Sequence, residues 1–138
     1  MKITSRGRYA LKVMIDIAEQ QSDDYIKLND IAMRHNISEK YLESIIASLT
    51  KNGILIGVRG KGGGYKLSKK PEEYTVGSIL KITEGSLTPV SCLDCKPNTC
   101  ENEESCKTLP LWQGLDKVID EYLESVTIAD LAFGTKKE

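Results

Sequence analysis

Three helical patterns followed by two strand-like segments fill the first half of the chain and restrict its fold more than any other feature. Apolar residues recur with helical spacing over residues 5–20, and shorter helical patterns follow over 28–34 and 39–51. Ser38 is a good N-cap for the third helix, and the Asn52-Gly53 pair supplies its C-terminal stop. Two short helices joined by a tight turn, with a longer helix before them, are typical of a helix-turn-helix.

A glycine-rich loop follows the third helix and joins strand-like segments at 54–58 and 65–67. The loop reads Arg59-Gly60-Lys61-Gly62-Gly63-Gly64, and its glycines allow the backbone to approach a phosphate chain closely. Arg59 and Lys61 supply cations, and arginine is suited to a narrow minor groove. A plain hairpin without a ligand is the alternative. The predicted fold is mainly α with a small β-wing: a winged helix-turn-helix.

The outward residues near the start of the third helix are the candidate readers of a DNA major groove. Glu43 is unusual among them, because phosphates repel a carboxylate unless it accepts a hydrogen bond from a cytosine amino group. It could equally face solvent or pair with Lys40. Tyr41 could contact DNA or pack inside the protein. The candidates are Ser38, Glu39, Lys40, Tyr41, Glu43 and Ser44.

The near-neutral net charge of −1 hides a marked asymmetry between the two halves of the chain. Residues 1–70 hold 13 Lys and Arg against 7 Asp and Glu, whereas residues 71–138 hold 6 against 13. A basic first half suits a polyanionic partner such as double-stranded DNA. Chance clustering of solvated charges is the alternative.

The second half of the chain contains a short helix over 75–84, a cysteine loop over 91–107 and a long amphipathic helix. One small domain cannot easily cover the apolar stripe of that helix, so we expect it to form a two-fold dimer that matches a palindromic operator. Packing on the first helix of the same chain is the alternative. We therefore expect a DNA-binding domain over 1–74 and a linker, loop and dimerisation region over 75–138. The stripe consists of Leu111, Trp112, Leu115, Val118, Ile119, Tyr122, Leu123 and Val126.

All four cysteines of the chain lie between residues 92 and 106, at Cys92, Cys95, Cys100 and Cys106. The residues around them are mostly polar, charged, Pro or Asn, so the thiols are not expected to be core, and a soft metal or cluster bound by thiolates is the default explanation. The start of the chain is charged, and no segment approaches the roughly 18 apolar residues of a membrane span. We therefore expect a cytoplasmic protein without a membrane partner, in a compartment where structural disulfides are rare.

Four segments together resemble the Rrf2-type family of bacterial winged-helix regulators. They are MKITSRGRYA at 1–10, ISEKYLE at 37–43, VRGKGGGY at 58–65 and Leu111-Trp112. The resemblance covers nearly the whole chain and implies a homodimeric transcription factor, usually a repressor, whose cluster-binding members carry three cysteines in this loop. Within the family, the chain resembles the regulators of iron-sulfur cluster assembly more closely than the cysteine-metabolism branch, whose loop lacks the cysteines.

The ligand set departs from the family pattern of three cysteines, and either Cys92 or Cys95 could be the first ligand. One branch takes a histidine three residues after the last cysteine, where this chain has Leu109, and another takes an acidic residue near the start of the first helix, where it has Arg8. The only histidine, His35, lies in the helix-turn-helix turn, where a capping or solvent-facing role is favoured over ligation. We therefore infer that the four cysteines supply four thiolates to an iron-sulfur cluster, with 2Fe-2S favoured and 4Fe-4S possible.

Three other functions compete with an iron-sulfur-dependent repressor of iron-sulfur assembly or cysteine metabolism genes. A tetrahedral zinc site, or a thiol-based redox response, would also use the cysteines, although structural zinc usually takes two CxxC pairs and this loop has one. A catalytic dithiol at Cys92 and Cys95 would lack its usual strand-helix-strand context, so we expect no enzyme. A cluster carrier that does not bind DNA would leave the basic first half unexplained.

Overall fold

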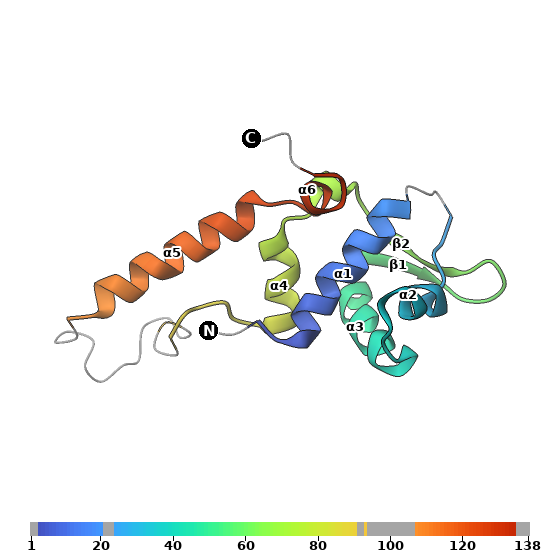
Figure 1. Ribbon diagram of the computed structural model, residues 1–138, viewed down its shortest axis with the longest axis horizontal. Helices are drawn as coiled ribbons and strands as arrows, with labels where there is room; N and C mark the ends of the chain where they lie inside the picture. Colours follow the sequence, from blue (N-terminus) through green and yellow to red (C-terminus); the bar gives the residue numbers. More distant parts are fainter. Residues whose placement is uncertain (1–2, 21–23, 91–92, 94–106, 135–138) are drawn as a thin grey trace.

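The computed structural model describes residues 3–20, 24–90, 93 and 107–134. Within these ranges the predicted helices and strands are present with bounds that differ by a residue or so. The elements are α1 (Ser5–Gln20), α2 (Leu28–His35), α3 (Glu39–Lys51), β1 (Leu55–Val58), β2 (Gly64–Leu67), the 3-10 turn η1 (Pro71–Glu73), α4 (Val76–Glu84), α5 (Leu109–Ser125) and α6 (Ile128–Phe133) (Figure 1).

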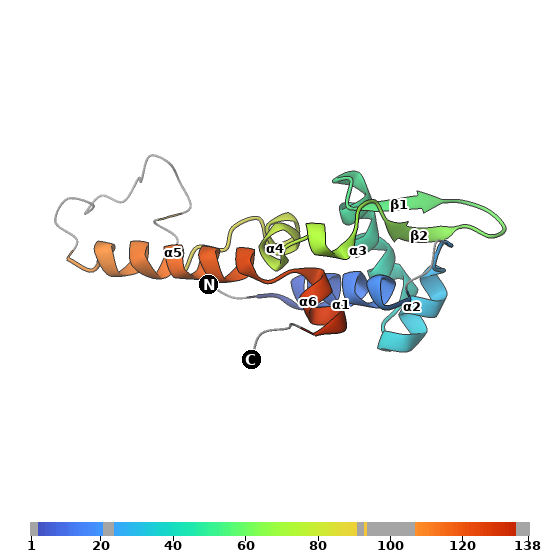
Figure 2. The same ribbon diagram turned by 90° about the horizontal axis from the view of Figure 1, so that it is seen from above.

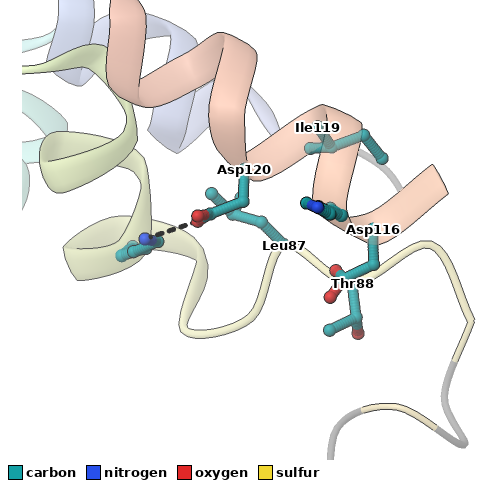
Figure 3. Close-up of a pocket in the computed structure, with 7 residues that line it drawn as sticks. Leu87, Thr88, Asp116, Ile119 and Asp120 are labelled. Carbon is teal, nitrogen blue, oxygen red and sulfur yellow. Dashed lines mark hydrogen bonds and ion pairs between the residues drawn. The ribbon is translucent and has the colours of Figure 1, made fainter. Parts of the chain in front are cut away.

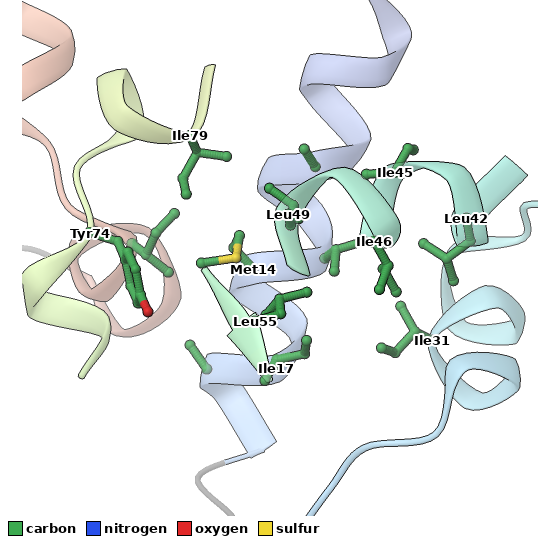
Figure 4. Close-up of a cluster of buried hydrophobic side chains, with 14 of the residues drawn as sticks. Met14, Ile17, Ile31, Leu42, Ile45, Ile46, Leu49, Leu55, Tyr74 and Ile79 are labelled. Atoms are coloured by element: carbon green, nitrogen blue, oxygen red, sulfur yellow. The ribbon is translucent and has the colours of Figure 1, made fainter. Parts of the chain in front are cut away.

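The core forms where the apolar stripe of α1 meets α3, β1 and the C-terminal α6 (Figure 4). Met14 of α1 is fully buried, and so is Ile31 of α2. The predicted inner face of α3 is confirmed, because Leu42, Ile45, Ile46 and Leu49 are all 0% exposed. A helix whose apolar residues recur every three or four positions can bury only one side, so the opposite side of α3 stays available to solvent.

The β-wing is an antiparallel pair in which Leu55 lies opposite Leu67 and Val58 lies opposite Gly64. The segment before α2 adds to the free edge of β2, where Ile26 and Tyr65 exchange two backbone hydrogen bonds of 2.8 Å each. Gly64 permits this pairing: its φ is +145°, and a Cβ there would clash with the Ile26 carbonyl oxygen. Only glycine fits both the conformation and the close approach.

The C-terminal half begins with α4, whose N-cap Thr75 accepts a hydrogen bond from the Ser78 N–H. Helix α5 projects away from the rest of the molecule, and its far end and the tip of the wing lie at opposite ends of the long axis (Figures 1 and 2). The chain then returns, because Thr75 and Thr127 form an antiparallel bridge that brings α6 against α1.

Residues from both halves of the chain share one core. Ile128 of α6 and Ile79 of α4 are 0% exposed and belong to the same cluster as the buried residues of α1 and α3. The structure is therefore a mainly α winged helix-turn-helix, as predicted. Helices α4 and α6 of the C-terminal half pack into its core, near the C-terminal end of α5.

Candidate nucleic-acid interface and cysteine loop

The outward face of α3 carries the residues predicted to read DNA. The Ser38 side chain caps the helix by accepting the Tyr41 N–H at 3.1 Å. Glu39, Lys40, Glu43 and Ser44 are exposed. In the described part of the chain no ion pair joins Glu43 to Lys40. The carboxylate of Glu43 is therefore available on the face that a helix-turn-helix directs into the major groove.

Like Ser38, the predicted readers Tyr41 and Ser44 already have partners within the protein. The Tyr41 ring packs edge-on against Tyr9 with centroids 5.9 Å apart, so packing accounts for at least part of its role. Arg6 of α1 donates from Nη1 to Ser44 Oγ at 2.9 Å and from Nη2 to the Ser44 carbonyl at 3.0 Å. Arg6 thus lies at the edge of the candidate interface. Sequence reasoning did not identify Arg6, whose one signal was a basic residue near the start of α1.

The wing presents its two cations at the end of the hairpin. Arg59 and Lys61 are both exposed, and a hydrogen bond of 2.9 Å from the Gly63 N–H to the Gly60 carbonyl closes the loop between the strands. Gly60 has a φ of +95°, a conformation that L side chains rarely adopt. The turn is therefore narrow and positively charged, as a loop that enters a groove between phosphates must be.

A buried carboxylate lies behind the helix-turn-helix. Asp16 of α1 is 4% exposed and accepts two hydrogen bonds from Arg34, at 2.8 Å from Nε and 2.7 Å from Nη2. His35 Nε2 lies 2.9 Å from the same carboxylate. Burial is the largest single influence and by itself raises the pKa of Asp16, but the hydrogen bonds and charges of Arg34 and His35 together lower it below its ordinary value.

This network changes the interpretation of His35. The predicted capping or solvent-facing role is wrong, because the ring bonds to Asp16 and the C-cap of α2 is Asn36, with a φ of 52°. Through Arg34 and His35 the carboxylate connects α1 to the last turn of α2, directly before the turn into α3. The network therefore holds the C-terminal end of α2 against α1.

The four predicted ligands Cys92, Cys95, Cys100 and Cys106 lie outside the described residues. Around them the structure describes the chain as far as Val90, then Leu93 alone, and again from Lys107, just ahead of α5. In the part of the chain that the structure describes, no three His, Cys, Asp or Glu side chains gather as a metal site would need.

Charged side chains connect α5 to α4. Lys81 of α4 lies 2.8 Å from Asp120 and 3.0 Å from Glu124, both on α5, and these contacts raise the pKa of Lys81. Glu124 also accepts a hydrogen bond of 2.8 Å from the Thr75 hydroxyl. A groove of about 320 Å³ lies next to the Lys81–Asp120 pair and is lined by Lys81, Leu87, Thr88, Asp116, Lys117, Ile119 and Asp120 (Figure 3).

Comparison with known proteins agrees with this architecture. The sequence profile of the Rrf2 family, described as iron-dependent transcriptional regulators, matches residues 3–133. The chain belongs to the Rrf2 family. Among its relatives, the transcriptional regulator IscR of Erwinia tasmaniensis is 37% identical over 131 residues, which are 95% of this chain and 78% of that protein.

Two solved structures that resemble this chain are those of CymR and IscR. CymR, the global cysteine regulator of B. subtilis, superposes with a TM-score of 0.83 at 35% identity and covers 99% of both chains. IscR of T. potens superposes with a TM-score of 0.72 at 34% identity, covering 95% of this chain and 85% of that one.

Membership of the Rrf2 family confirms the predictions that the protein is a DNA-binding transcriptional regulator and that it is not an enzyme. Among the described residues, no helix is long and apolar enough to span a bilayer.

Removing both wing cations of this Rrf2-family regulator, with Arg59→Ala and Lys61→Ala, should weaken DNA binding and flatten its salt dependence. Each lost phosphate contact reduces the slope of log affinity against log salt concentration by about 1, so the expected change is about 2. Fluorescence anisotropy at several salt concentrations measures it. Lys117→Ala, on α5 and away from the wing, is the matched control and should leave the slope unchanged. An unchanged slope in the wing variant would exclude the wing from the interface.

Proposed function

We propose that this regulator is a repressor whose affinity for DNA depends on an iron-sulfur cluster held by Cys92, Cys95, Cys100 and Cys106. The observation that carries the proposal is the placement of all four thiols in one short segment between α4 and α5. Thiolates are the ligands that iron-sulfur clusters require, and four of them complete either a 2Fe-2S or a 4Fe-4S site. The relatives named IscR support the same assignment.

The described residues fit a ligand set made of cysteines alone. Leu109 is an apolar side chain only 8% exposed, and Arg8 is a cation that donates to Ser5, so neither can act as a fourth ligand. His35 is engaged by Asp16. When bound, the cluster would supply an iron centre that oxygen, nitric oxide or iron starvation can modify or remove. The target genes we propose are those for iron-sulfur assembly or cysteine supply.

We also propose that the regulator binds a palindromic operator as a homodimer. Support comes from four apolar residues that share one face of α5 and remain exposed: Leu111 (60%), Leu115 (40%), Val118 (60%) and Tyr122 (65%). A second copy would cover this face by two-fold symmetry. The DNA contacts we propose are Ser38, Glu39, Lys40, Tyr41, Glu43 and Ser44 of the α3 region, with Arg59 and Lys61 of the wing.

The contacts between α4 and α5 suggest how the loop would influence DNA binding. The loop connects these two helices, and Lys81 holds them together through Asp120 and Glu124. Helix α4 in turn packs against α1 and α3. A loop that changes shape would therefore alter the position of α5, and with it the spacing of the two recognition helices in a dimer.

Spectroscopy and DNA titration on one anaerobic sample test the proposal. We expect visible charge-transfer absorption with stoichiometric iron and sulfide, and an operator affinity that changes when the cluster is removed. Cys106→Ser should lose iron and sulfide, whereas the neighbouring control Ser105→Ala should retain both. A colourless protein that contains zinc or only free thiols, yet still binds DNA, would contradict the proposal and assign the response to structural metal or thiol oxidation.

A further inference from the structure

The hydroxyl of Tyr74 lies at the base of the wing, where both strands of the hairpin meet the core. Tyr74 is 4% exposed and its ring belongs to the main hydrophobic cluster (Figure 4). A tyrosine hydroxyl placed this deeply needs hydrogen-bond partners, because an unpaired polar group in the interior is costly. The partners that it has define its role.

Those partners come from both ends of the hairpin. The hydroxyl lies 2.6 Å from Ser68 Oγ and accepts a hydrogen bond of 2.9 Å from the Lys69 N–H, both directly after β2. It also lies within donating distance, 3.0 Å, of the carbonyl of Ile54, the residue before β1. Ser68 adds a contact of its own, donating to the Gly53 carbonyl at 2.7 Å.

These contacts link the ends of both strands to one another, whereas the backbone pairing with the segment before α2 reaches β2 alone. Ile26 pairs with Tyr65 on the free edge of β2, while β1 lies on the far side of the sheet. Each strand has four residues, so the wing loop lies roughly 13 Å from the base. A rotation of about 5° at the base therefore moves the loop by roughly 1 Å, which is enough to misplace a side chain in a minor groove about 6 Å wide.

Tyr74 also joins the wing to the end of α5. Its backbone carbonyl accepts the Ile128 N–H at 2.9 Å, and Val76 donates to the Val126 carbonyl at 2.8 Å two residues later. Val126 is the C-cap of α5. One residue thus contacts the base of the wing through its hydroxyl and the segment after α5 through its main chain.

We propose that Tyr74 is a positioning residue for DNA binding, whose hydroxyl fixes the base of the wing and so directs Arg59 and Lys61 at the DNA. This inference rests on the proposed role of the wing cations. It concerns a residue that does not itself contact DNA.

A double-mutant cycle on the full chain separates positioning from simple stability. The four proteins are the parent, Tyr74→Phe, the wing variant with Arg59→Ala and Lys61→Ala, and the combination of all three changes. The probe is a duplex enriched from a random-sequence library by the parent protein. Tyr74→Phe keeps the buried ring and removes only the hydroxyl, and we expect it to weaken binding roughly five- to tenfold in the parent. In the wing variant the same change should weaken binding less than about twofold.

Each remaining outcome overturns the inference. Equal losses in both backgrounds would mean that Tyr74 acts through overall stability or through α3. If Tyr74→Phe keeps the parent's affinity while the wing variant clearly loses affinity, the proposed DNA contacts stand but Tyr74 has no positioning role. If the wing variant itself keeps the parent's affinity, both the proposed DNA contacts and the inference are wrong.

Two further measurements distinguish a loss of positioning from unfolding of the Tyr74→Phe variant. Ser68→Ala removes one partner of the hydroxyl outside the core and should show the same dependence on the wing cations, with a smaller loss. Hydrogen exchange should accelerate at the Lys69 amide in Tyr74→Phe. Tyr25→Phe is the matched control, because the Tyr25 ring contacts Lys66 of β2 but its hydroxyl has no hydrogen bond within the described residues, and binding should be unchanged.

Discussion

Replacing Arg34 with methionine should lower the free energy of unfolding by about 3 kcal/mol. The side chain of Asp16 is 5% exposed, so the substitution leaves a buried carboxylate with His35 as its principal remaining partner. A buried charge without its counterion loses hydration and gains little in return. Urea denaturation followed by circular dichroism measures the change. A loss below about 0.5 kcal/mol, the usual range for surface changes, would contradict this account.

Replacing the other partner of the ion pair, with Asp16→Asn, should lower the free energy of unfolding by less than Arg34→Met does. It leaves behind the guanidinium of Arg34, whose side chain is 41% exposed and can turn toward water. The double variant should therefore be more stable than Arg34→Met alone, since it removes the buried charge. An Asp16→Asn variant less stable than Arg34→Met would mean that the carboxylate is needed for its hydrogen bonds more than for its charge.

The same network predicts how the free energy of unfolding depends on pH in acid. Since the pKa of Asp16 in the folded state lies below its ordinary value of 3.8, the ionised carboxylate stabilises the protein above that pH. That contribution is lost as the pH falls from about 3.8 through the lower pKa of the folded state. The difference in unfolding free energy between the parent and Asp16→Asn should therefore shrink as the pH falls over this range.

Local chemistry made the helices and the wing predictable. The apolar stripe of α3 predicted that Leu42, Ile45, Ile46 and Leu49 are buried, and Ser38 caps this helix because its side chain suits that position. The glycines between two short strands predicted the hairpin. In each case the interactions that decide the structure lie within a few residues of one another.

Contacts between distant residues were not predictable in the same way. Asp16 lies 18 residues from Arg34, and Arg6 lies 38 from Ser44. Sequence spacing says nothing about such pairs, although a carboxylate next to Ile17 on a buried stripe was a sign that a partner was needed. The return of Thr127 to Thr75, which brings α6 into the core, depends on tertiary packing in the same way. The cysteine ligands remain a prediction, because their residues lie outside the described structure.

Changing Val118 to glutamate should abolish the proposed dimer and weaken binding to a palindromic duplex about 100-fold or more. Val118 is 60% exposed in the middle of the apolar face of α5, so the substitution costs the isolated chain little. In a two-fold dimer the change occurs twice across the symmetry axis and places two carboxylates in an apolar contact. Sedimentation velocity and anisotropy with full and half operators measure both effects.

The matched control is Gln113→Glu, which adds the same charge to an exposed position on the other side of the helix. It should leave the oligomeric state and the affinity for the full operator unchanged, whereas Val118→Glu should bind the full and half operators alike. The half operator is the informative probe, because a monomer with an intact winged helix keeps its affinity for one half-site and loses only the advantage of binding both. A Val118→Glu variant that stays dimeric would move the interface away from α5, and one that loses half-site affinity would mean that the substitution damages the fold.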